Sequence, residues 1–188
     1  MPKRKCYNLT QAFESMEYLH NRIIFYTKKG TKMNYRPARK NDLDLLVQYR
    51  LNFIEMHPAH MAYHFMEKSC LHYFMESMEN KTFEAIIAEE AQHPIGIGMI
   101  FYYRSVPSCL NPTGWNGYIT NLFVEEQHRG QGIGRELVKR LVQKAEKRNC
   151  YIIMLHASEM GRPLYLKMGF HDITNGMVLN NWEASKKN

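Results

Sequence analysis

One segment, NLFVEEQHRGQGIGRELVKRLV at Asn121–Val142, limits the fold of this chain more than any other feature. An apolar run leads into a polar turn that holds Gly130, Gly132 and Gly134, and an amphipathic helical pattern follows. Glycine destabilises ordered backbone, so this density indicates that bare backbone is required there. Such a strand–turn–helix unit offers unpaired N–H groups and a positive helix dipole, which together bind anions. We therefore expect a phosphate site at this turn, with a tight turn that binds no ligand as the alternative.

Two common phosphate-binding motifs are excluded by the spacing of these residues. The P-loop sequence G-x-x-x-x-G-K-[ST] does not occur in the chain. The dinucleotide sequence G-x-G-x-x-G also fails, because Arg135 stands three residues after Gly132. The pattern present is Arg-x-x-Gly-x-Gly, formed by Arg129, Gly132 and Gly134.

The remaining periodicities predict one mixed α/β domain over residues 33–188. Strands are expected at 33–38, 83–90, 94–104 and 118–124, with a buried strand at 150–157 and a closing hairpin around Asn175-Gly176. Helices are expected over Asp42–Met56 (with Asn41 as N-cap), Ala62–Met78 and Arg135–Arg148, with a short one before Gly169.

Residues 1–32 form a basic N-terminal extension. They hold seven Lys or Arg against two Glu, and so carry most of the net charge of +7. Residues 10–27 have the apolar spacing of a short amphipathic helix, which is either a docking helix or lies upstream of a natural start at Met33. The body of the chain is nearly balanced in charge, which argues against nucleic acid as its partner.

Cysteine usage and hydropathy predict a cytoplasmic protein without a membrane anchor. The four cysteines are scattered, and no C-x-x-C pair indicates a structural metal site. The basic start, MPKRK, is not followed by the apolar run of a signal peptide, and no apolar run approaches the length of a membrane span.

Two motifs together resemble the GNAT superfamily of N-acetyltransferases. LFVEEQHRGQGIGRELV is similar to the superfamily's acetyl-CoA segment, and LHASEMGRPLYLKMGF, farther along the chain, is similar to its second hallmark. Order and spacing agree across residues 33–180. The resemblance implies a GNAT-like α/β domain, with a mixed, mostly antiparallel twisted sheet of six to seven strands flanked by four helices. The helical N-terminal extension lies outside the resemblance and is expected from its apolar spacing alone.

The resemblance also implies roles for individual residues. The backbone of three strand residues would pair with the pantetheine arm, namely Leu122, Phe123 and Val124. The turn would hold the pyrophosphate through Arg129, Gly130, Gln131, Gly132, Ile133, Gly134 and Arg135. Tyr165 would protonate the departing thiolate, although a core aromatic packed on Phe170 is the alternative. Ser158 stands where the family often has Asn and would bind the cofactor with a shorter reach.

The resulting expectation is an enzyme that transfers acetyl from acetyl-CoA to a primary amine by direct attack in a ternary complex. A non-catalytic acyl-CoA sensor or interaction module is the alternative. On the acceptor side, Asn121 and His57 are candidates for substrate binding and Glu55 is the candidate base. A homodimer is expected from the resemblance.

The histidines His57, His60 and His64 have a spacing that would suit a metal site on one helix face. Pro58 disfavours a helix at His57, so we expect no metal and a loop that lines the acceptor cleft. The sequence does not identify the acceptor.

Overall fold

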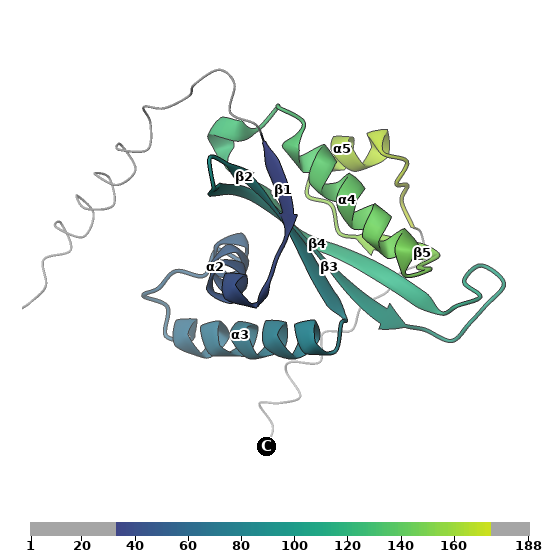
Figure 1. Cartoon of the computed structure of the whole chain (residues 1–188), viewed down its shortest axis with the longest axis horizontal. Helices are drawn as coiled ribbons and strands as arrows, with labels where there is room; N and C mark the ends of the chain where they lie inside the picture. The colour runs from purple at the N-terminus through teal and green to yellow at the C-terminus, as the bar shows by residue number, and fades with distance from the viewer. Residues whose placement is uncertain (1–32, 174–188) are drawn as a thin grey trace, which may run out of the picture. The chain divides into compact units, whose positions relative to one another are not determined.

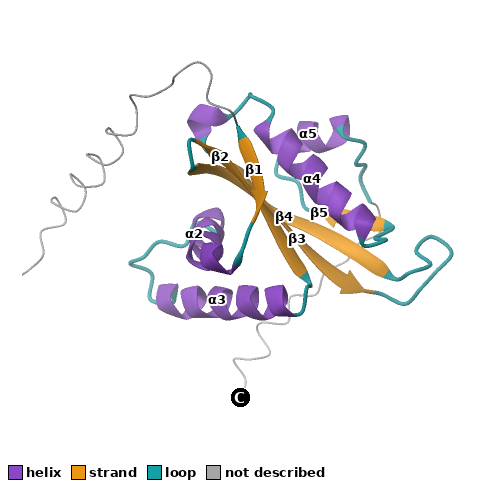
Figure 2. Cartoon of the chain, viewed as in Figure 1, coloured by secondary structure: helices purple, strands orange, loops and turns teal. Residues whose placement is uncertain are grey.

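The computed structural model describes residues 33–173 of the 188-residue chain. Its main elements, coloured by type in Figure 2, are β1 (Asn34–Pro37), α2 (Leu43–Phe53), α3 (Tyr63–Glu79), β2 (Phe83–Glu90), β3 (His93–Arg104), β4 (Trp115–Val124), α4 (Ile133–Lys147), β5 (Ile152–Leu155) and α5 (Arg162–Lys167). Single 3-10 turns span Lys40–Asp42 and Glu126–His128. The expected N-terminal helix and the hairpin around Asn175 lie outside the described residues, and the domain boundary after residue 32 stays a prediction.

The sheet has the order β1-β2-β3-β4-β5 and is antiparallel except for the parallel pair β4–β5. Five strands are therefore present among residues 33–173, fewer than the six to seven expected. Residues 170–173 were expected to begin a closing strand, but they are irregular. The reason is local, because the carboxylate of Asp172 pairs with Arg162 and fastens this segment to α5.

Helices cover both faces of the sheet, with α2 and α3 on one side and α4 and α5 on the other (Figure 1). Strand alternation sends one set of apolar side chains toward α2 and α3, and this core includes Leu46, Leu51, Phe74, Ile87, Ile97 and Met99. The apolar stripe of α4 buries Leu137, Val138 and Leu141 against the opposite face. In residues 33–173, no helix has the length and apolar character needed to cross a bilayer.

Close contact between α4 and β3 depends on Gly98. A Cβ atom at this position would lie 2.9 Å from Cδ1 of Leu141, closer than real Cβ contacts. A larger residue at 98 would push α4 away from the sheet, and with it the turn that precedes α4.

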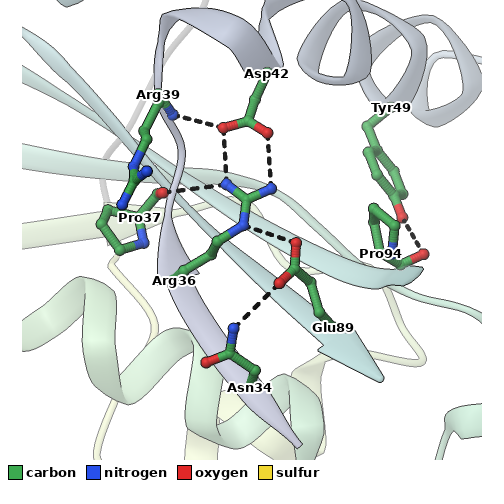
Figure 3. A network of polar contacts seen from close by, with 8 residues as sticks. All are labelled: Asn34, Arg36, Pro37, Arg39, Asp42, Tyr49, Glu89 and Pro94. Carbon is green, nitrogen blue, oxygen red and sulfur yellow. Dashed lines mark hydrogen bonds and ion pairs between the residues drawn. The ribbon is translucent and has the colours of Figure 1, made fainter. Parts of the chain in front are cut away.

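An arginine-centred network ties β1 to its neighbours (Figure 3). The guanidinium of Arg36 donates to both carboxylate oxygens of Asp42 at 2.8 Å and to Glu89 of β2 at 2.7 Å. Asp42 also accepts the backbone N–H of Arg39 at 2.7 Å. Arg39 immediately precedes the turn that leads into α2. The network therefore fixes the position of the start of α2 relative to the sheet.

Three local predictions need correction. Asn41 is not the N-cap, because Asp42 takes the free N–H and the turn begins one residue earlier than Asn41. The first helix ends at Phe53, since Glu55 turns into left-handed backbone at φ 53°. β5 is not buried, because it is the last strand of the described sheet and Ile152 is 37% exposed.

Candidate active site

A fork opens between β4 and β5 at the predicted cofactor strand. Their parallel pairing ends at Ile119 opposite Leu155, and β4 continues past this point as far as Val124. On its other side, β4 carries a bulge where the register with β3 shifts, and Asn121 adopts φ 49° there. The bulge increases the local twist and bends β4. The last residues of β4, which include Leu122 and Phe123, therefore lie beyond the end of their neighbour β5.

The glycine turn needs glycine for its backbone conformation. Gly130 has φ 76° and Gly132 has φ 82°, in the region that residues with a Cβ atom rarely adopt. A Cβ atom at either position would meet open space within 4 Å. Gly134 differs, because its φ is ordinary and a Cβ atom there would make only van der Waals contacts. The turn thus combines required left-handed backbone with an open volume in front of it.

The N-terminus of α4 faces this turn with unpaired donors. Helix α4 begins at Ile133, and Glu136 N–H is the first to bond back, to the Gly132 carbonyl at 3.1 Å. The N–H groups of the preceding first turn have no intrahelical acceptor. Nε of Arg129 donates to the Val124 carbonyl at 3.1 Å and so joins the turn to the end of β4.

The two sequence motifs meet at Gly134. A Cβ atom there would lie 3.6 Å from Leu164 of α5, and 3.9 Å from the side chains of Leu122 and Val124. The strand end, the first turn of α4 and helix α5 are therefore in contact. Tyr165, the candidate acid, is the residue after Leu164, so the fold brings both predicted halves of the donor site together.

Tyr165 is 8% exposed, and its ring packs edge-on against Phe170 at 5.8 Å between centroids. Burial raises the pKa of its phenol, so the group holds its proton at neutral pH. None of the described residues forms a hydrogen bond with its hydroxyl. Ser158 lies in the turn before α5, where its Oγ accepts the Gly161 N–H at 3.1 Å.

A cleft of about 650 Å³ lies between α3 and the face of β3 and β4. Its walls are rich in aromatic and methionine side chains, among them Met66, Tyr73, Phe74, Met99, Phe101 and Tyr103. Three residues of β4 complete the lining, Tyr118, Thr120 and Asn121. The cleft therefore reaches the bulge where the open edge of β4 begins.

Comparison with known proteins agrees with this arrangement. A profile of the acetyltransferase (GNAT) family matches residues 48–170. The chain belongs to the GNAT acetyltransferase family.

Relatives of this GNAT chain include acetyltransferases from several organisms. A predicted acetyltransferase from Clostridium acetobutylicum, crystallised with acetyl-CoA, has 36% sequence identity and a TM-score of 0.73, over 81% of this chain and 98% of that one. The thialysine N-epsilon-acetyltransferase of Mus musculus is 30% identical over 105 residues, 51% of this chain and 60% of that protein. The glucosamine 6-phosphate N-acetyltransferase of Trypanosoma brucei brucei is 35% identical over 54 residues, 29% of this chain and 37% of that protein. The chain thus spans 60% or less of the length of these two curated relatives.

Two acceptor-side predictions of this GNAT chain fall outside the cleft. Glu55 and His57 line a second, smaller cavity of about 270 Å³ with Asn52, Met56 and Pro58. The histidines make local contacts, since Nδ1 of His57 accepts the Ala59 N–H and Nδ1 of His60 accepts the Ala62 N–H, each at 3.1 Å. Within residues 33–173, no group of three or more His, Cys, Asp or Glu is placed to hold a metal.

Asn121, by contrast, lies in the wall of the cleft, at the bulge of β4. It is 1% exposed, and its Oδ1 accepts Nη1 of Arg50 at 2.9 Å. Its Nδ2 is a buried donor for which the described residues provide no acceptor. The substrate-binding role of Asn121 stays a prediction.

Sequence reasoning missed Arg50 and the pair Tyr118–His156. A signal for Arg50 existed, because helical spacing puts it four residues after the buried Leu46, on the apolar stripe of α2. For Tyr118 and His156 no such signal existed. They are 38 residues apart, and only the parallel pairing of β4 and β5 joins them.

Proposed function

We propose that this chain is an N-acetyltransferase that transfers the acetyl group of acetyl-CoA to a primary amine in a ternary complex. One observation carries the proposal, which is the position of Asn121. It forms the bulge where the open edge of β4 begins, and it also lines the cleft. Donor edge and acceptor cleft therefore meet at a single residue, as direct transfer between two bound substrates requires.

The donor side fits acetyl-CoA. The backbone of Leu122, Phe123 and Val124 runs past the end of β5 and is available to pair with an extended pantetheine arm. The open volume before Gly130 and Gly132 accommodates a pyrophosphate, and the first-turn N–H groups of α4 supply donors and positive potential. Acetyl-CoA supplies the activated acetyl thioester. The 36% identical relative from Clostridium acetobutylicum, crystallised with acetyl-CoA, supports this assignment.

Chain residues then stabilise charge on the acetyl oxygen. Strand N–H groups at the end of β4, near Val124, are the proposed donors to this oxygen. Their positions are set by the bulge and by the contacts of Leu122 and Val124 with the first turn of α4. Backbone donors held in this way need no reorganisation when charge develops.

Two proton transfers remain, and the chain offers a group for each. An alkyl ammonium has a pKa near ~10 and must lose a proton before its nitrogen attacks. Tyr118 faces the cleft, and its Oη takes this proton while its own proton passes to Nδ1 of His156, 2.6 Å away. Tyr165, kept protonated by burial, then gives its proton to the departing sulfur.

Glu55 is the competing base. It is exposed and lies in the second cavity with His57, so the cleft lining favours Tyr118 for this role. Glu55→Gln is accordingly expected to leave turnover nearly unchanged. A large loss of turnover in Glu55→Gln would transfer the role of base to Glu55.

Thiol release from acetyl-CoA tests the proposed function. We expect release that depends on an added amine, measured over a panel of amino acids, polyamines, amino sugars and peptides, with reactions lacking an acceptor as the control. Calorimetric binding of coenzyme A without thiol release for any amine would show a non-catalytic acyl-CoA binding module. Failure to bind coenzyme A would reject both the acetyltransferase and the acyl-CoA binding module. Homodimerisation and the role of residues 1–32 stay predictions.

A further inference from the structure

Arg50 is exceptional among the half-buried arginines of residues 33–173. Each of the others has a carboxylate partner, Arg36 with Asp42 and Glu89, Arg140 with Glu136, and Arg148 with Glu84. Arg50 instead donates to the neutral amide oxygen of Asn121, and no carboxylate of the described residues lies within 4 Å of it.

The surroundings of Arg50 make this charge costly. Its side chain leaves the last turn of α2 and lines the cleft, where most neighbours are aromatic or methionine. None of the lining residues is Asp or Glu. A guanidinium in a partly desolvated apolar cleft lacks the compensation that buried charges normally receive. The cleft is therefore electrostatically incomplete until a bound molecule brings an anion.

The anion would lie close to the reacting edge of β4. Nη1 of Arg50 is 2.9 Å from Oδ1 of Asn121, and Leu122, which follows Asn121, lies on the open edge. An anion on Arg50 and an amine at that edge are therefore separated by a short span within one acceptor molecule. The aromatic cleft remains for the rest of that molecule.

We infer that the acceptor is an α-amino acid with an apolar or aromatic side chain. Its carboxylate pairs with the guanidinium fork of Arg50, its amine lies at the β4 edge, and its side chain occupies the cleft. This inference rests on the proposed acetyl transfer and names the acceptor class for it. Polyamines are disfavoured, because they bring further positive charge to Arg50 and the cleft lining has no carboxylate to receive them.

A matched pair of acceptors tests the assignment. L-phenylalanine and phenylethylamine share the ring and the amine, and only the first carries a carboxylate. In the unaltered protein, we expect kcat/KM for L-phenylalanine to exceed that for phenylethylamine by roughly tenfold or more, the size of a charge-assisted hydrogen bond.

Substitution at Arg50 then assigns the preference to this residue. Arg50→Gln should remove the preference, because it should raise KM for L-phenylalanine far more than KM for phenylethylamine, and Arg50→Lys should keep part of the preference. Arg104→Gln is the control, because Arg104 is an exposed arginine stacked on Trp115 outside the cleft lining. Coenzyme A affinity should be equal in all variants, which shows that they are folded.

The outcomes separate this inference from the proposed function. Faster reaction of phenylethylamine, spermidine, glucosamine 6-phosphate or a peptide than of apolar amino acids overturns the inference and leaves acetyl transfer intact. A preference retained in Arg50→Gln also overturns it. If no amine reacts, binding of L-phenylalanine to the coenzyme A-loaded protein is measured by calorimetry. Absence of binding rejects the inference. Failure of coenzyme A itself to bind rejects the proposed function.

Discussion

The phenol oxygen of Tyr118 lies 2.6 Å from Nδ1 of His156, and this contact bridges β4 and β5 beside the last pair of their parallel ladder, Ile119 and Leu155. Tyr118 faces the cleft, whereas His156 is exposed. The pair therefore connects the acceptor cleft with solvent across the base of the fork, which is the path that a proton leaving an ammonium would need.

Removal of either member of this pair should slow the reaction. We expect Tyr118→Phe and His156→Gln each to lower kcat by about 10²-fold, a typical size for general base catalysis. His156→Gln removes the imidazole that accepts the proton, and Tyr118→Phe removes the hydroxyl that passes the proton on, so the two losses should be similar. Initial rates of thiol release at neutral pH measure both losses. Tyr151→Phe, at an exposed tyrosine just before β5, is the control, and full neutral-pH turnover in His156→Gln would remove the relay.

Tyr165→Phe should separate the acid role from the packing role. The variant keeps the ring that packs on Phe170, so coenzyme A affinity and unfolding temperature should stay nearly unchanged, while kcat falls by about 10²-fold. Because burial raises the pKa of Tyr165 above its usual value, the hydroxyl is protonated throughout the neutral range and should not cause a loss of rate there. Unaltered turnover in Tyr165→Phe would leave Tyr165 as a core aromatic only.

Three glycine variants separate the effect of a phosphate site from the free-energy cost of placing alanine at positive φ. Gly132→Ala and Gly169→Ala each force alanine to positive φ, at about 1–2 kcal/mol, and each places a methyl group in open space. Only Gly132→Ala should also weaken coenzyme A binding, by at least roughly tenfold. Gly134→Ala should lower the free energy of unfolding less than either of these variants, because the φ of Gly134 is ordinary. Calorimetry with coenzyme A and urea unfolding measure the two effects, and equal affinity in Gly132→Ala and Gly169→Ala would contradict the pyrophosphate assignment.

Loss of the Asp42 carboxylate should destabilise the domain in a pH-dependent way. Hydrogen bonds from Arg36 hold the pKa of Asp42 below 3.8 in the folded state. Its contribution is therefore complete above pH 3.8 and is lost as the pH falls through the lower folded value. Asp42→Asn should lower the free energy of unfolding, measured in urea at neutral pH, by about 1–3 kcal/mol. The difference in this free energy between the variant and the unaltered protein should disappear in stronger acid. Asp44→Asn, at an exposed residue in the first turn of α2, should lose far less stability and show no such pH dependence.

Local patterns predicted the helices and strands well where one chain segment determines them. Strand β2 was expected at 83–90 and occurs at Phe83–Glu90, and α4 begins two residues before the expected Arg135. Errors arose where an ion pair between side chains overrides the pattern of the adjoining backbone. Asn41 lost its capping role because Asp42 is held by Arg36 of β1, and Phe170 does not begin a strand because Asp172 binds Arg162.

The sequence by itself predicted the donor half of the proposed site. The glycine turn and the segment around Tyr165 are local motifs, because residues adjacent in the sequence determine the positive φ at Gly132 and the short helix before Gly169. On the acceptor side the sequence named Asn121, but only the tertiary structure supplied its partner Arg50 and the pair Tyr118–His156. Arg50 meets Asn121 across 71 residues, and Tyr118 meets His156 across 38, so only the packing of α2 on β4 and the parallel pairing of β4 with β5 bring these groups together.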